Sequence, residues 1–201
     1  MTKIFLTGKQ VFFIIFFLAV LSAEAQDFTN SFAEKQYKIT KTGMFTLGGW
    51  SLGNIVVNAA LLSGPKNSTR YFHEMNIYWN LVNLAIAGGG YWANQKSRGK
   101  ARSVYGILER QHKIEKSLLF NAGLDVAYMA AGQLLRERAK HVSGNSQRLE
   151  GFGNGLILQG AFLFTFDVLL HAVHVSHRKK NKKDLEQIKL VFNSGGIRMY
   201  F

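Results

Sequence analysis

Four long segments of this 201-residue chain are almost free of charged residues, and they limit the folds that it can adopt. They are residues 43–65, 75–95, 117–135 and 151–177, of which the first two carry no charge and the last two carry one aspartate each. An α-helix needs about 20 apolar residues to cross a bilayer, and each segment is close to or above that length. A helix on the surface of a soluble protein has a broad charged face, which these segments lack. The sequence therefore predicts an all-α, four-helix transmembrane bundle, with a soluble four-helix bundle as the competing interpretation.

The composition agrees with long helices packed in a membrane. The chain has 20 glycines and a single proline, Pro65, and it contains no cysteine. Glycines allow close helix packing in bilayers, and scarce proline permits long helices. Without cysteine, disulfides, thiolate metal sites and cysteine nucleophiles are excluded. The net charge of +13 lies in short runs between apolar segments, which favours contact with anionic lipid headgroups and predicts no nucleic-acid partner.

Residues 1–25 have the pattern of a secretory signal peptide. Lysines precede an apolar stretch at residues 11–21, and Ala23-Glu24-Ala25 matches a small-x-small cleavage site. We expect cleavage after Ala25, so that the mature chain begins at Gln26 in the envelope of a bacterium, in its inner membrane. An uncleaved anchor is the alternative, although the apolar stretch is only about half as long as a membrane span.

Two polar segments flank the helical domain of residues 43–177. Residues 26–42 are interpreted as a flexible lead-in or a short helix on the membrane surface. Residues 178–201 form a basic tail in which two β-rich runs surround the turn sequence Asn-Ser-Gly-Gly at residues 193–196, a pattern typical of a β-hairpin.

The distribution of basic residues conflicts with the signal peptide. A cleaved signal followed by four spans places residues 26–42, 96–116 and 178–201 outside, where they would hold 17 Lys and Arg against six on the other side. Basic residues normally concentrate on the cytoplasmic side. The sequence therefore leaves the sidedness open.

Each predicted helix carries a narrow polar stripe at helical spacing, and we expect the stripes to face one another because an unpaired amide in lipid costs several kcal/mol. Counting depth along each helix predicts a midplane layer of Asn54, Asn83, Asp125 and Asp167. The same count predicts one flanking layer of Asn58, Asn80 and Gln159, and another of Ser51, Asn121 and His171.

This polar core has two interpretations. Acidic residues inside a membrane commonly mark ion paths or ligand sites, which makes the core a candidate site. The same groups could instead form interhelical hydrogen bonds that only hold the bundle together. The candidate site residues are Asn54, Asn80, Asn83, Asn121, Asp125, Gln159, Asp167 and His171.

Histidines in the fourth segment raise a metal site as an alternative. His171, His174 and Asp167 could together hold an ion, whereas a cluster of histidines at the membrane surface next to the basic tail needs no metal. We predict the latter, and no cofactor. No catalytic array, P-loop or dinucleotide fingerprint is present.

Three motifs carry a resemblance to a known family. They are Phe72-His73-x-Met75-Asn76-x-x-Trp79-Asn80-x-x-Asn83, Asn121-x-Gly123-Leu124-Asp125-Val126 and Gln159-Gly160-x-Phe162-Leu163-x-x-Phe166-Asp167. They resemble an uncharacterised family of small multi-pass membrane proteins from Gram-negative bacteria. The resemblance implies a helical membrane bundle and no activity.

Taken together, these features predict a non-enzymatic integral membrane protein whose polar core binds or passes a small polar ligand or ion. One alternative is a structural or accessory subunit that meets lipid, a protein partner or further copies of itself through its basic loops. Another is a membrane enzyme using Asp125 and Asp167.

Overall fold

The computed structural model describes residues 8–99 and 103–186, and this part of the chain is all-α. Its four helices are α1 (Gly8–Ala60), α2 (Ser68–Lys96), α3 (Val104–Ala139) and α4 (Ser146–Lys180). The β-hairpin predicted near the C-terminus falls outside the described residues.

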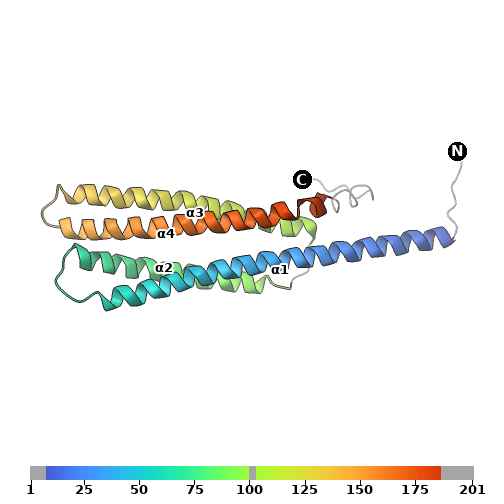
Figure 1. Ribbon diagram of the computed structural model, residues 1–201, viewed down its shortest axis with the longest axis horizontal. Coiled ribbons are helices and arrows are strands. Elements are labelled where there is room, and N and C mark those ends of the chain that lie inside the picture. Colours follow the sequence, from blue (N-terminus) through green and yellow to red (C-terminus); the bar gives the residue numbers. More distant parts are fainter. Residues whose placement is uncertain (1–7, 100–102, 187–201) are drawn as a thin grey trace.

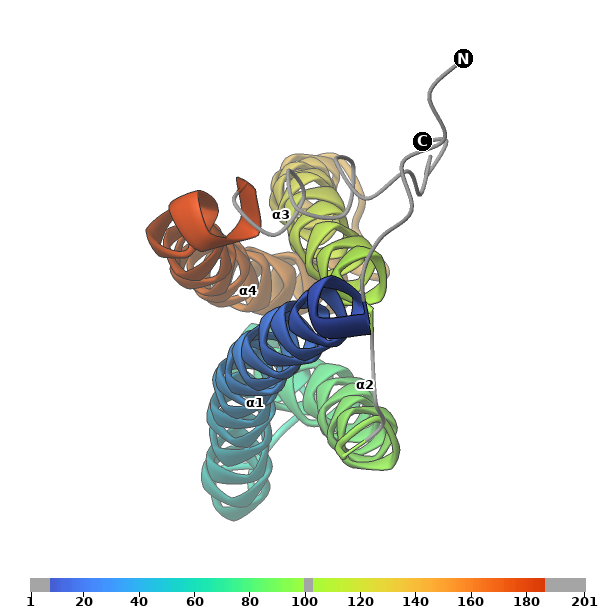
Figure 2. The same cartoon turned by 90° about the vertical axis from the view of Figure 1, so that its right-hand side faces the viewer.

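The helices form two antiparallel pairs that lie side by side. Helix α1 packs along α2, α3 packs along α4, and α4 also lies against α2, whereas α2 and α3 make little contact (Figures 1 and 2). The α1–α2 and α3–α4 connections lie at one end of the bundle, and the C-terminal ends of α2 and α4 lie toward the other (Figure 1). The polar stripes of all four helices can therefore meet in one interior.

Side-chain caps and backbone conformation determine where helices begin and where the chain turns. The Asn67 side chain accepts a 2.9 Å bond from the Arg70 amide and caps α2, and Ser103 caps α3 by accepting a 3.1 Å bond from Gly106 N. Between α1, which ends at Ala60, and α2, Gly64 adopts φ +117° and precedes Pro65, and the two residues turn the chain.

Helix α1 is much longer than the predicted first span. It has 53 residues, which corresponds to about 80 Å of helix, far more than the roughly 30 Å of a bilayer core. Residues 26–42 are therefore neither a separate surface helix nor a flexible lead-in, and no break marks the expected cleavage point after Ala25. Phe32 packs against Ile107 and Leu185, so α3 and the chain after α4 extend the bundle alongside this part of α1.

An ion pair ties this extension to the turn after α2. The Arg98 guanidinium donates bonds of 3.0 and 3.3 Å to the Glu34 carboxylate. The hydrogen bond and the charge of Glu34 raise the pKa of Arg98 above its ordinary value. Because both side chains are largely exposed, this pair aligns the helices more than it stabilises them.

Backbone contact between α3 and α4 occurs at glycines. A Cβ built on Gly132 would lie 2.6 Å from the carbonyl oxygen of Gly153, and one built on Gly153 would meet the carbonyl of Gly132. Gly151 lies equally close to the start of α2, at Ser68. In contrast, Gly88 and Gly89 on α2 have open space around them. The close-packing seam of the bundle therefore runs along α4.

Candidate functional site

The interior of the bundle is polar and much of its exterior is apolar. Asn76, Asn80 and Gln159 are completely inaccessible to solvent, while Val56, Phe120 and Leu134 are each about two-thirds exposed. Further apolar side chains are exposed on the same stretches of all four helices: Leu52, Val57, Leu81, Val82, Ile86, Leu119, Val126, Phe164, Val168 and Leu169. This arrangement inverts that of a soluble protein, in which polar side chains are mostly outside.

Gln159 of α4 is the centre of one hydrogen-bond network. Its carbonyl accepts a 3.2 Å bond from Trp50 Nε1, and its amide nitrogen donates to Asn76 Oδ1 at 2.5 Å and to Asn54 Oδ1 at 3.4 Å. Three helices therefore meet at one side chain.

The asparagines of this network bond first within their own helices. Asn54 and Asn76 donate their amide nitrogens to the carbonyls four residues earlier, at Trp50 and Phe72. Asn80 does the same to Asn76. Each donation uses one N–H of the amide group locally. The oxygens of Asn54 and Asn76 accept from Gln159 on another helix, whereas the Asn80 oxygen has no partner among the described residues. An aspartate could not fill both roles when ionised, because it has no donor.

In the structure, the residues of two predicted layers have different partners from those expected. Asn58 pairs with His73, with 2.7 Å between Oδ1 and Nδ1, at the rim of the bundle. Gln159 contacts Asn54 and Asn76, and no bond joins it to Asn58 or Asn80. The reason is the tight turn at residues 61–67: α2 begins at Ser68, seven residues before the predicted span, so Asn76 lies opposite Asn54.

A pocket of about 450 Å³, partly open to the surface, is lined by residues of all four helices. Four of the predicted site residues line it together: Asn83, Asn121, Asp125 and Asp167. The carboxyl groups of Asp125 and Asp167 are within hydrogen-bonding range of each other. We do not expect two buried carboxyl groups so placed to be ionised at the same time, because like charges this close repel each other.

Three buried polar atoms on residues that line this pocket have no partner among the described residues. They are Trp79 Nε1, Asn83 Nδ2 and Asp125 Oδ2. The side chains of Asn83 and Asp125 are both 3% exposed. An unsatisfied buried donor or acceptor costs about 1–3 kcal/mol. Two further buried atoms, Gln36 Oε1 and Asn80 Oδ1, also have no partner among the described residues but lie on residues outside this pocket.

A second network, which the sequence did not predict, lies toward the end of the bundle where Phe32 of α1 packs against Ile107 and Leu185. We call this part of the bundle the extended end. Gln36 of α1 donates to Gln111 Oε1 at 2.8 Å, and Gln111 donates to Glu115 at 2.9 Å and to the His174 carbonyl at 2.8 Å. Arg178 Nε bonds both oxygens of Glu115. The i, i+4 spacing of Gln111 and Glu115 is a helical signal, but both residues lie between the predicted spans of residues 75–95 and 117–135.

The histidines of α4 face different partners. His171 Nδ1 lies 3.0 Å from the Glu115 carbonyl, and His177 Nε2 lies 3.2 Å from the Phe32 carbonyl. His174, rather than the predicted His171, lines the pocket. Across residues 8–99 and 103–186, no three His, Asp or Glu side chains are placed to hold a metal ion, so the alternative of a metal on His171, His174 and Asp167 gains no support.

The fold and interior define a class: an all-helical bundle with a polar core and an apolar surface. Residues 46–168, more than half of the chain, match the model of a family of unknown function, DUF6992. The chain belongs to this family, in agreement with the predicted membership of an uncharacterised family. Comparison with curated proteins and with solved structures gives no match.

Proposed function

We propose that all four helices lie in a membrane. The inversion of polar and apolar side chains carries this proposal, since lipid is the solvent that favours an apolar exterior. Helices α3 and α4 are long and apolar enough to cross a bilayer. On α3, Lys116 and Arg136 enclose the apolar stretch and stand about 30 Å apart along the helix, which matches a bilayer core. Among the described residues, α1 and α2 have no equally long apolar stretch of low charge, but their outward faces carry apolar side chains such as Val56 and Leu81.

Residues 1–25 are proposed to direct the chain to a bacterial inner membrane by the secretory route. N-terminal sequencing of the protein purified from membranes should then give Gln26 as the first residue, because cleavage follows Ala25. A chain that begins at residue 1 or 2 would show that the segment is retained as part of α1.

We further propose that the pocket binds a small polar ligand or ion, without enzymatic activity. Trp79 and Asn83 present unused donors, and Asp125 presents an oxygen that can accept a bond or carry a proton. Binding sites commonly retain such groups at a cost in stability, which a bound ligand offsets.

The free energy of unfolding of two variants distinguishes a ligand site from a purely structural hydrogen-bond network. Asn83→Leu should leave the ligand-free protein as stable as the wild type or more stable, because leucine removes an unpartnered amide nitrogen and fills similar space. Asn76→Leu should destabilise it by about 1–3 kcal/mol, because Gln159 loses its partner. The midpoint of denaturant unfolding in detergent measures both. Equal destabilisation by the two variants would mean that Asn83 is structural and would remove the main support for the site.

A structural or accessory role is the second candidate. The Gln159 network favours it, since a centre that joins three helices is suited to holding the bundle together. In that role the basic residues at the extended end would meet anionic lipid headgroups, a protein partner or a second copy of the chain.

A further inference from the structure

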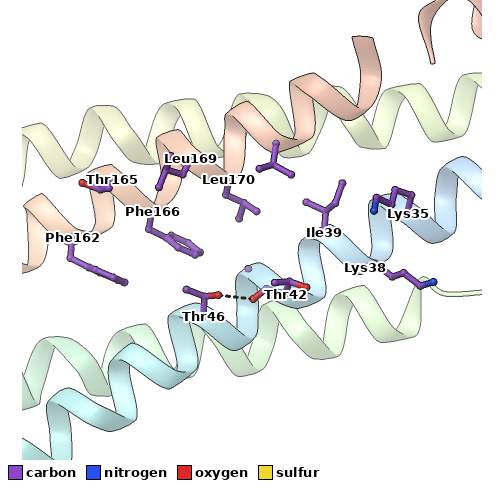
Figure 3. A pocket seen from close by; sticks show the side chains of 12 residues that line it. Lys35, Lys38, Ile39, Thr42, Thr46, Phe162, Thr165, Phe166, Leu169 and Leu170 are labelled. Atoms are coloured by element: carbon purple, nitrogen blue, oxygen red, sulfur yellow. Dashed lines mark hydrogen bonds between the residues drawn. The ribbon is translucent and has the colours of Figure 1, made fainter. Parts of the chain in front are cut away.

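A groove runs between α1 and α4 on the outside of the bundle. Its volume is about 430 Å³, and α4 supplies most of its apolar wall (Figure 3). Phe162, Phe166, Leu169 and Val173 follow one another at spacings of four, three and four along one face of α4. Leu169 and Val173 are 61% and 49% exposed. An apolar channel open along a helical surface is suited to a flexible hydrocarbon chain.

Gly43 of α1 and Leu170 of α4 meet at the floor of the groove. A Cβ built on Gly43 would lie 2.7 Å from the Leu170 side chain, so the leucine fills the space beside the glycine. Trp50 stacks on Phe162 with 3.8 Å between ring centroids and closes the far end. The groove therefore has a base at Gly43, a closed end at Trp50 and an open end at the extended part of the bundle.

The open end of the groove is basic. Lys35 and Lys38 of α1 lie there, three residues apart on one face (Figure 3). Glu34 is the nearby acid, 4.0 Å from the Lys38 amine, but Arg98 already bonds both of its carboxylate oxygens. These four side chains together carry two net positive charges, which remain available to an anion.

We propose that this groove holds an acyl chain of one anionic phospholipid, with the phosphate between Lys35 and Lys38. Gln36, between the two lysines, bonds Gln111 of α3, five residues before Lys116, where the proposed bilayer ends. The apolar wall therefore faces the hydrocarbon and the amines face the headgroups. The proposal rests on the embedding of the helices in a membrane and is independent of the pocket lined by all four helices. Charge complementarity selects an anionic lipid over a zwitterionic one.

Native mass spectrometry of the full chain in detergent tests this site. The wild-type protein, titrated with phosphatidylglycerol or with phosphatidylcholine of the same acyl chains, should retain one phosphatidylglycerol molecule preferentially. Each lysine near an anionic headgroup contributes a factor of about five in affinity. The Lys35→Gln, Lys38→Gln double variant should therefore bind phosphatidylglycerol about 25-fold more weakly, close to phosphatidylcholine.

Matched variants separate this site from general basicity and from folding. Lys113→Gln with Lys116→Gln removes two charges on α3, away from the groove, and should leave the preference unchanged. Val173→Trp should fill the groove and weaken both lipids, whereas Val168→Trp, which is not on the groove, should weaken neither. Circular dichroism verifies folding of each variant.

Three results would overturn the lipid site: equal retention of the two lipids by the wild type, an undiminished preference in the double lysine variant, or a lipid-free dimer as the stable species. Inorganic phosphate should not displace the bound lipid, because the acyl chain supplies part of the affinity; displacement would identify a simple anion site instead. Failure of membrane embedding is distinguishable, because the protein would then be absent from the membrane fraction before any lipid is added.

Discussion

Replacing Gly132 or Gly153 with alanine is expected to destabilise the bundle by about 2–3 kcal/mol, because a methyl group at either position overlaps the backbone of the facing helix. A carbonyl oxygen held in a helix cannot move aside as a flexible side chain can, so α3 and α4 must separate. Separation also weakens the packing on either side of the contact. SDS-induced unfolding of the purified protein, followed by circular dichroism, measures the loss.

The two glycine variants should not be additive. Once one methyl group has separated the helices, the second meets less resistance, so the double variant should cost less than the sum of the single variants. Gly123→Ala is the matched control on α3, because open space surrounds that position. It should be neutral or stabilising by up to about 1 kcal/mol, given the better helix propensity of alanine. Losses at Gly123 as large as those at Gly132 would contradict the proposed seam.

Gln159→Leu is expected to cost about 2–3 kcal/mol. The change keeps the approximate volume of the side chain but leaves Trp50, Asn54 and Asn76 without the partners described above. Interhelical hydrogen bonds in membranes average about 0.6 kcal/mol and reach about 1.7, and three are lost together. The same SDS titration gives the free energy of unfolding.

A control on the same helix isolates the effect of the network. Thr165→Val removes a hydroxyl group that bonds only the Ala161 carbonyl of its own helix and lies on the exterior, so it should change stability by less than about 0.5 kcal/mol. Combining Gln159→Leu with Asn76→Leu should cost less than the sum of the two changes, because they share a bond. Full additivity would show that the Gln159–Asn76 bond contributes nothing.

Sequence patterns predicted the all-helical class and the inward direction of the polar stripes, because a helical repeat places residues such as Asn76, Asn80 and Asn83 on one face whatever the tertiary context. They did not predict the register between helices. Register depends on the length of the turn at residues 61–67 and on the close approach at Gly132 and Gly153. Neither feature can be derived from the spacing of polar and apolar residues.

The extended end was missed for a different reason. Gln36 and Gln111 are polar residues in charged segments, which are typical of loops, and their burial depends on each other across 75 residues of sequence. Likewise, Asp125 and Asp167 could be expected to lie near one another, but which of their atoms remain without partners depends on side-chain packing. The assignment of these residues to a ligand site remains a prediction.

Spin-label accessibility in lipid vesicles tests the inverted bundle most directly. The chain has no cysteine, so a single cysteine can be introduced and labelled with a nitroxide at one outward apolar residue of each helix: Val56, Leu81, Phe120 or Val168. We predict that all four labels collide readily with oxygen, which concentrates in hydrocarbon, and are protected from a water-soluble nickel chelate. A label at Lys113, on the extended end, should show the opposite. Free access of the nickel chelate to the labels on α1 and α2 would contradict four membrane-embedded helices, and free access to all four would mean that the bundle does not lie in a membrane.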